Sequence, residues 1–161
     1  MKNEADNHQA LSLTLQTYLQ NAGLSQGEPV QVNVLAGGQS NPTYRLQVGA
    51  RQMVLRKQPP GQLVAGAHAV DREYRVMRAL AGSQVPVPAM LAYEADPGVL
   101  GTPFYLMDFL AGRVFMDPAL PELAPAERSA LYDEMNRVIA ALHQVDLQAV
   151  GLVDYGRHGG Y

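Results

Sequence analysis

Two periods of hydrophobic residues alternate along the chain. Near the N-terminus, apolar side chains recur every three to four positions, which predicts an amphipathic helix from His8 to Ala22 that ends at Gly23. From Val30 the period changes to two, so that apolar and polar residues alternate over three short stretches. This pattern predicts three strands, each with one buried face, at residues 30–34, 44–48 and 53–56. Because only short connections separate them, we expect an antiparallel meander.

The helical period returns after the third predicted strand. It predicts a helix over residues 68–80, and the two prolines of the segment 85–88 exclude a helix there. Two further strands are expected at 90–93 and 104–109, with a turn at 96–98 between them. The predicted fold class is therefore α+β, with five antiparallel strands, one helix inserted after the third strand and a helix at the N-terminus.

The last third of the chain changes character again. A proline-rich connector at 118–125 precedes a third amphipathic helix, expected over 128–143, and the glycine-rich tail from 146 onward has no clear period. These changes divide the chain into three parts: an N-terminal helix and linker at 1–29, a first lobe at 30–110, and a second part at 111–161.

Composition and charge narrow the class of protein. Twelve basic and fifteen acidic side chains give a net charge of −3, which argues against nucleic-acid binding through a basic surface. The chain has no cysteine, which excludes disulfides, zinc knuckles and thiol catalysis. The N-terminus lacks a signal-peptide pattern, and no apolar run is long enough to span a bilayer. We therefore expect a cytoplasmic protein that has neither a nucleic acid nor a membrane as its partner.

The turn between the first two predicted strands is the first candidate for chemistry. It consists of Gly37, Gly38, Gln39, Ser40 and Asn41. Adjacent glycines let backbone N–H groups approach an anion closely, and the last two side chains add hydrogen-bond donors. A hairpin that needs glycine only for positive φ is the simpler alternative. The turn matches neither the P-loop nor the dinucleotide fingerprint, because a strand and not a helix follows it.

A basic and an acidic residue follow on the next two elements. Arg56 shares the strand face of Val54, so its guanidinium lies beside an apolar row, where it either reaches solvent or holds an anion. Glu73 lies on or beside the buried stripe of the next helix, where a carboxylate needs a partner. An exposed Glu73 paired with Arg72 or Lys57 in water is the alternative. A basic strand residue followed by an inward helix glutamate is the arrangement that holds nucleotide phosphates in kinases.

The order of these features along the chain, a glycine turn, a basic strand residue and a helix glutamate, resembles the aminoglycoside phosphotransferase family. The resemblance is greatest to the kinase-like domains of this family that occur alone or fused to acyl-CoA dehydrogenases. The resemblance covers nearly the whole chain from about Val30. It rests on the segments 35–44, 54–61, 68–77, 85–88 and 101–109, continued by 142–143 and 151–156. It implies a protein-kinase-like fold with ATP between two lobes, in which 30–110 is the small nucleotide-binding lobe with its hinge. Residues 111–161 would then hold only the first helix of an incomplete helical large lobe.

The resemblance also implies roles for individual residues. The turn from Gly37 to Asn41 would cover the phosphates of ATP. Arg56 would face the α- and β-phosphates in the place of the usual lysine, with Glu73 as its ion-pair partner. Arginine keeps the charge and offers a two-pronged donor, but it differs from lysine in reach. In the hinge, Asp108 and Leu110 would hydrogen-bond adenine through their backbone groups.

The catalytic residues of this family have no counterpart in the chain. Phosphoryl transfer also needs an aspartate that orients the acceptor hydroxyl, and an asparagine and a second aspartate for Mg²⁺. In the family the first of these stands in a His-Gly-Asp loop, which none of the four histidines begins; His158-Gly159-Gly160 has glycine in place of the aspartate. We therefore expect no catalytic residue and no metal ligand in these 161 residues. Mg²⁺ is expected only in an intact protein, and the chain alone is expected to be inactive.

Two functions follow as expectations. The first is that the chain is the N-terminal fragment of an enzyme that transfers the γ-phosphate of ATP to a hydroxyl of a small molecule. The resemblance to dehydrogenase-associated members favours a hydroxyacyl-type acceptor, and aminoglycoside, choline-like and sugar-like acceptors are the alternatives. The alternative is a non-catalytic kinase-like module that binds a nucleotide or a partner. In that case the helix at 128–143 would leave apolar residues partly uncovered, which favours self-association. A small α+β domain whose kinase-like order is coincidental is the third interpretation.

Overall fold

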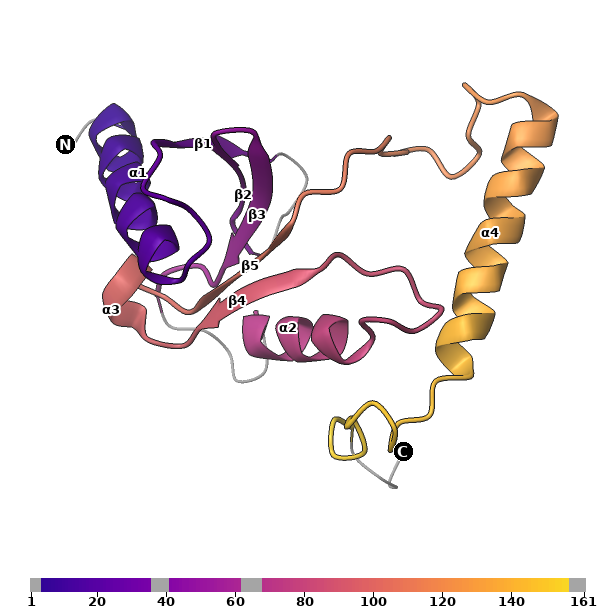
Figure 1. The fold of residues 1–161 in the computed structure, drawn as a ribbon. Helices are drawn as coiled ribbons and strands as arrows, with labels where there is room; N and C mark the ends of the chain where they lie inside the picture. The colour runs from indigo at the N-terminus through magenta and orange to yellow at the C-terminus, as the bar shows by residue number, and fades with distance from the viewer. Residues whose placement is uncertain (1–3, 36–40, 62–67, 157–161) are drawn as a thin grey trace. The chain divides into compact units, whose positions relative to one another are not determined.

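The computed structural model describes residues 4–35, 41–61 and 68–156 (Figure 1). The elements follow the order α1 (Glu4–Asn21), β1 (Val30–Val34), β2 (Thr43–Val48), β3 (Arg51–Lys57), α2 (Val70–Ala79), β4 (Met90–Glu94), α3 (Pro97–Leu100), β5 (Phe104–Asp108) and α4 (Pro125–His143). The contacts divide the chain into a first unit, Met1–Arg75 with Pro88–Phe109, and a second unit, Val76–Val87 with Leu110–Tyr161. The predicted α+β class is confirmed.

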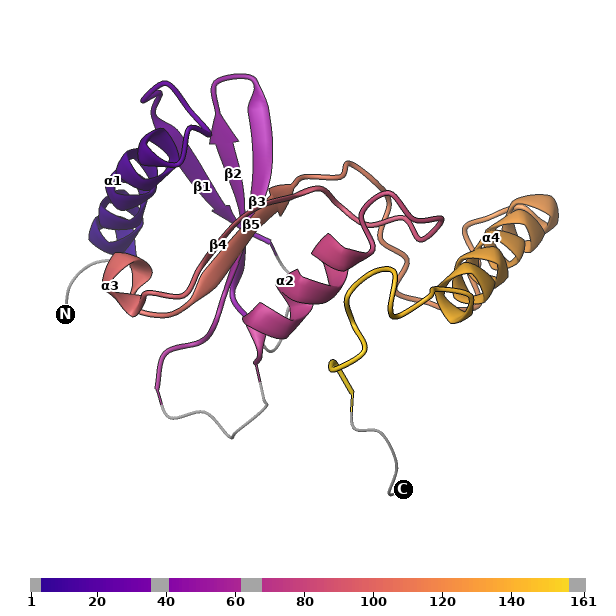
Figure 2. The same ribbon diagram turned by 60° about the horizontal axis from the view of Figure 1, so that its bottom comes forward.

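A five-stranded antiparallel sheet forms the first unit. The strand order is β1-β2-β3-β5-β4, and every neighbouring pair is antiparallel. The first three strands form the expected meander, whereas β5 inserts between β3 and β4. Glycine at position 49 allows the tight connection between β2 and β3, because its φ of 55° lies in the left-handed region. Figure 2 shows α1 and the start of α2 on opposite faces of this sheet.

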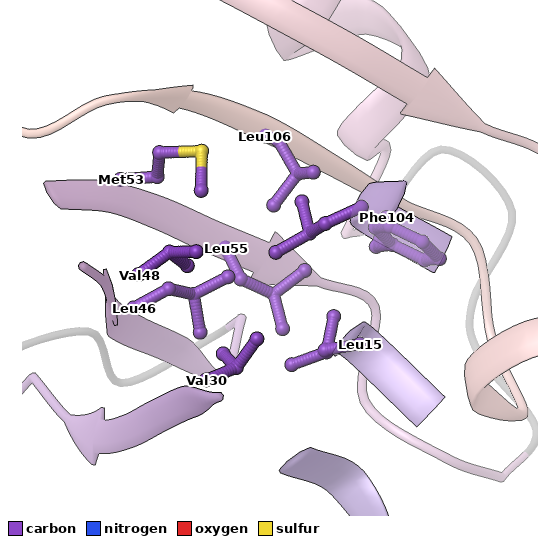
Figure 3. Close-up of a cluster of buried hydrophobic side chains, with 9 residues drawn as sticks. Leu15, Val30, Leu46, Val48, Met53, Leu55, Phe104 and Leu106 are labelled. Atoms are coloured by element: carbon purple, nitrogen blue, oxygen red, sulfur yellow. The ribbon is translucent and has the colours of Figure 1, made fainter. Parts of the chain in front are cut away.

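The hydrophobic core lies between α1 and one face of the sheet. Side chains along α1 that are three to four positions apart point into it, and Leu15 and Leu19 are fully buried. Tyr18 of the same helix meets the ring of Phe104 edge-on, with 5.1 Å between the ring centroids. The sheet contributes Val30, Leu46, Val48, Met53, Leu55, Phe104 and Leu106 to this cluster (Figure 3). The core therefore fixes which face of each strand is turned toward α1 and which is turned away.

The turn predicted at 96–98 is instead the start of the one-turn helix α3. The side chain of Asp96 accepts a hydrogen bond of 2.7 Å from the backbone N–H of Gly98, and Pro97 occupies the first turn, where its missing N–H is not needed. Gly101 ends the helix in the left-handed conformation, with φ of 81°. The same residues that favour a turn therefore also favour a single helical turn.

The helix α4 dominates the second unit. It begins at Pro125, and the backbone N–H of Ala124 donates a 3.0 Å hydrogen bond to the side chain of Glu127. No residue of α4 is buried, and its Met135 and Ile139 are each 49% exposed. A groove of about 640 Å³ runs along this face, lined mainly by Leu123, Leu131, Met135, Val138 and Ile139.

None of the helices in the described residues combines the length and the hydropathy that crossing a bilayer requires.

Candidate functional site

The face of the sheet turned away from α1, here called the distal face, carries a row of polar side chains. Side chains alternate along a strand, so Arg56 and Tyr105 point away from the core that holds Leu55 and Leu106. The register places one residue from each of four strands in this row: Thr43, Arg56, Tyr105 and Tyr93. The start of α2 packs against the row, because the rings of Tyr74 and Tyr93 stack with 5.3 Å between their centroids.

Arg56 and Glu73 form an ion pair between the row and α2. The guanidinium Nε donates to Oε2 of Glu73 at 2.7 Å, and Nη2 donates to Oε1 at 3.4 Å. The two side chains are 26% and 35% exposed, so water reaches the pair only in part. The structure thus brings together the basic strand residue and the helix glutamate that sequence analysis singled out. Lys57, the alternative partner, instead donates to the backbone carbonyl of Leu100 at 2.8 Å.

The carboxylate of Glu73 also accepts hydrogen bonds from two buried side chains. Nδ2 of Asn41 donates to Oε1 at 3.1 Å, and the hydroxyl of Tyr105 donates to Oε2 at 2.9 Å. Burial raises the pKa of Tyr105 far above its ordinary value, and the hydrogen bond to Glu73 raises it further. Tyr105 therefore keeps its proton at neutral pH and remains a donor. Glu73 is the centre of the network, since its two oxygens accept hydrogen bonds from Arg56, Asn41 and Tyr105.

Asn41 joins this network to His68, which lies two positions before the start of α2. Its side chain is 1% exposed, and its Oδ1 lies 2.9 Å from Nδ1 of His68. Because Nδ2 of Asn41 donates to a carboxylate, Oδ1 is the acceptor on the other side, and His68 must carry its proton on Nδ1. His68 has φ of 58°, a left-handed conformation that is costly for a residue with a Cβ. The bond to Asn41 helps to hold His68 in that conformation.

Arg56 retains hydrogen-bonding capacity beyond its contact with Glu73. Its Nη1 donates to the hydroxyl of Thr43 at 3.1 Å, and that hydroxyl donates to the backbone carbonyl of Asn41 at 3.0 Å. A guanidinium has five N–H groups. After the bonds to Glu73 and Thr43, each terminal nitrogen still has one N–H without a hydrogen-bond partner among the described residues. Arg56 is therefore oriented by its neighbours and still able to bind an anion.

The other residues singled out from the sequence have different outcomes. Gly37, Gly38, Gln39 and Ser40 lie outside the described residues. Asp108 ends β5, its backbone N–H donates to the carbonyl of Ala89 at 2.9 Å, and its carboxylate lies 3.6 Å from Arg51. A contact between Asp108 and a base would therefore have to use its carbonyl. Leu110 follows in the second unit, where its side chain is 66% exposed.

Three members of the network, Thr43, Tyr105 and His68, were not identified as site residues from the sequence. Thr43 and Tyr105 lie in strands whose pattern predicts only burial or exposure, and their position beside Arg56 depends on the strand register. His68 was recognised only as the start of a helix. The hydrophobic alternation of β5 contains one signal: Tyr105 lies between two core residues, so it must point to the opposite face.

Metal-ligating side chains do not gather in the part of the chain that the structure describes. No three His, Cys, Asp or Glu side chains among residues 4–35, 41–61 and 68–156 lie close enough together to hold an ion. The free N–H groups of Arg56, in contrast, suit an anion such as a phosphate.

Known proteins similar to this chain share most of its length. Acyl-CoA dehydrogenase family member 10 of Mus musculus is 45% identical over 148 residues, which cover 91% of this chain and 14% of the mouse protein. Acyl-CoA dehydrogenase family member 11 of Gallus gallus is 50% identical over 132 residues, which cover 82% of this chain and 17% of the chicken protein. A crystal structure from Ralstonia eutropha JMP134, assigned to the aminoglycoside phosphotransferases, matches with a TM-score of 0.76 at 47% identity, over 92% of this chain and 42% of that one.

The chain therefore spans less than a fifth of these two relatives and less than half of the solved structure. The family described as "Phosphotransferase enzyme family" matches residues 31–161, which include the sheet except for Val30, the first residue of β1, together with Arg56, Glu73 and α4. On this match and on the shared kinase-like fold, the chain belongs to the phosphotransferase enzyme family.

Proposed function

We propose that this chain is the nucleotide-binding part of an ATP-dependent phosphotransferase that transfers the γ-phosphate to a hydroxyl group of a small molecule. The observation that carries the proposal is the hydrogen bonding of Arg56. Its guanidinium is held by Glu73 and Thr43, and it keeps one N–H on each terminal nitrogen for an anion. A pre-oriented, two-pronged cation of this kind suits the oxygens of a nucleotide phosphate.

Phosphoryl transfer depends mainly on positioning and on electrostatic stabilisation of the phosphate oxygens. ATP, when bound, supplies the phosphoryl group. Arg56 would hold the α- and β-phosphates, and Glu73 would fix the direction in which the guanidinium points. The turn from Gly37 to Asn41 would cover the phosphates, and the carbonyl of Asp108 and the N–H of Leu110 would bind adenine. The names of the two dehydrogenase-family relatives favour a hydroxyacyl-type acceptor.

Replacing Arg56 by methionine tests the phosphate contact. We expect the affinity of the full-length protein for ATP, measured by isothermal titration calorimetry, to fall about 10- to 100-fold, because charged hydrogen bonds to phosphate are lost. The ATP affinity of Arg56→Lys should lie between those of Arg56→Met and the unchanged protein, since lysine keeps the charge and loses the two-pronged donor. Arg137→Met is the matched control, because Arg137 is an exposed arginine that pairs with Glu134 on α4. Equal ATP affinity of Arg56→Met and the unchanged protein would contradict the proposal.

A separate turnover assay tests whether the 161-residue chain can catalyse phosphoryl transfer. The 161 residues contain no His-Gly-Asp sequence to orient an acceptor hydroxyl. We therefore expect the 161-residue chain to release no ADP above background when ATP, Mg²⁺ and hydroxylated acceptors are supplied together. ADP release that depends on the acceptor would show that catalytic residues lie within these 161 positions.

A second candidate function is a partner-binding module, and the apolar groove of α4 favours it. Met135 and Ile139 are about half exposed and line one groove together with the partly buried Leu131, so they form a continuous apolar surface and not isolated exposed residues. We expect the 161-residue chain to sediment as a dimer at micromolar concentration and Met135→Glu to sediment as a monomer. Asn136→Glu, an exposed neighbour outside the lining of the groove, should remain dimeric. A monomeric unchanged chain at every concentration would exclude self-association through this face.

A further inference from the structure

A second arginine lies on the distal face, next to the row that contains Arg56. The register places Arg45 opposite Val54, and Val54 opposite Met107, so these three side chains form the next row across β2, β3 and β5. Two residues along a strand correspond to about 7 Å. The guanidinium carbon of Arg45 lies 5.7 Å from the ring centroid of Phe109, which directly follows β5. Arg45 therefore lies toward the Asp108 end of β5, whereas Arg56 is held at Glu73.

Arg45 is only partly satisfied by its surroundings. Its Nε is buried and has no hydrogen-bond partner, and no carboxylate pairs with Arg45 among the described residues. Its neighbours in the row are the apolar Val54 and Met107, and its contact with Phe109 is a cation–π interaction. Apart from the side of the guanidinium that contacts Phe109, a ligand can gain contact with the planar face of this cation, which attracts aromatic rings.

We propose that Arg45 contacts the base of the nucleotide, stacking its planar guanidinium on one face of the purine while Phe109 lies against the guanidinium. This inference rests on the proposed ATP-binding function and adds a residue to it. Base and phosphates are the two ends of a nucleotide, and Arg45 and Arg56 are two cations one row apart on one face of the sheet. Guanidinium planes stack on nucleobases, whereas the apolar neighbours of Arg45 offer no further donors to a phosphate.

Comparing two ligands, one with a base and one without, separates the contribution of the base to binding from that of the phosphates. Binding of ATP and of inorganic tripolyphosphate to the full-length protein is measured by isothermal titration calorimetry for Arg45→Met, Arg45→Lys and Arg56→Met. Arg45→Met is expected to weaken ATP binding about tenfold and to leave tripolyphosphate binding unchanged. Arg45→Lys keeps the charge without the plane, so it should recover only part of the loss. Arg56→Met should weaken the binding of both ligands.

The outcomes distinguish this inference from the function on which it rests. An equal loss for ATP and tripolyphosphate in Arg45→Met would make Arg45 a phosphate residue and overturn the inference. Unchanged ATP affinity in both Arg45 variants would overturn it as well, while the loss in Arg56→Met would leave the proposed function standing. If the unchanged protein bound neither ligand, the proposed function would fall, and the role of Arg45 with it. The thermal unfolding midpoint of each variant verifies that it is folded, and Arg45→Lys carries the test if Arg45→Met does not fold.

Discussion

Replacing Glu73 by alanine is expected to lower the free energy of unfolding by about 2–4 kcal/mol. The carboxylate accepts hydrogen bonds from Arg56, Asn41 and Tyr105, and the last two side chains are almost fully buried. Each buried donor left without a partner costs about 1–3 kcal/mol, and Arg56 would lose its counter-charge. The loss stays below the sum of these effects, because the ion pair is partly exposed and water replaces some of the contacts.

Urea unfolding followed by circular dichroism measures this effect. Glu122→Ala serves as the matched control, because Glu122 is an exposed glutamate of the second unit and should change the free energy of unfolding by no more than about 0.5 kcal/mol. Should Glu73→Ala unfold at the same urea concentration as Glu122→Ala, the network around Glu73 would contribute nothing to stability. Its members would then be grouped only by the packing of α2.

Replacing Leu15 by alanine is expected to lower the free energy of unfolding by about 3–4 kcal/mol. Leu15 is fully buried between α1 and the sheet, so the change removes apolar contacts and leaves a cavity in the core. Leu13→Ala on the same helix is the control, since Leu13 is 59% exposed and its loss should cost no more than about 0.5 kcal/mol. Both changes replace leucine by alanine within one helix, so the intrinsic helix propensity cancels between them.

The difference between the two leucine variants can be read from the midpoints of their urea unfolding curves. A common midpoint for Leu15→Ala and Leu13→Ala would show that α1 is not packed on the sheet through Leu15. The measured value also tests whether α1, which lies entirely before the region matched by the family, belongs to the folded unit.

Local patterns predicted the elements of this fold more accurately than their arrangement. Alternation of apolar and polar residues identified β1 at Val30–Val34 and placed β2 and β4 within a residue of their bounds. The insertion of β5 between β3 and β4 could not be predicted this way, because pairing between distant strands is decided by the packing of the whole sheet. The turn at Asp96 was ambiguous for a related reason, since the same capping residues start a turn and a short helix.

The residues of the candidate site could also be predicted only where a local pattern identifies them. Arg56 and Glu73 could be identified because a charge beside an apolar row or stripe requires a partner. Tyr105 was hidden among apolar residues of β5, and only the register with Arg56 places its hydroxyl beside Glu73. Arg45 was not identified as a candidate residue, because its contact with Phe109 joins parts of the chain that no local pattern connects.

The hydrogen bond between Asn41 and His68 has a consequence for the connectivity of the chain. Asn41 directly follows residues 36–40, and His68 directly follows residues 62–67. One side-chain contact therefore links the residues that directly follow these two segments, and the same amide is bound to Glu73. A change at Asn41 would act on His68 and on Glu73 together, although these residues lie 27 and 32 positions further along the chain.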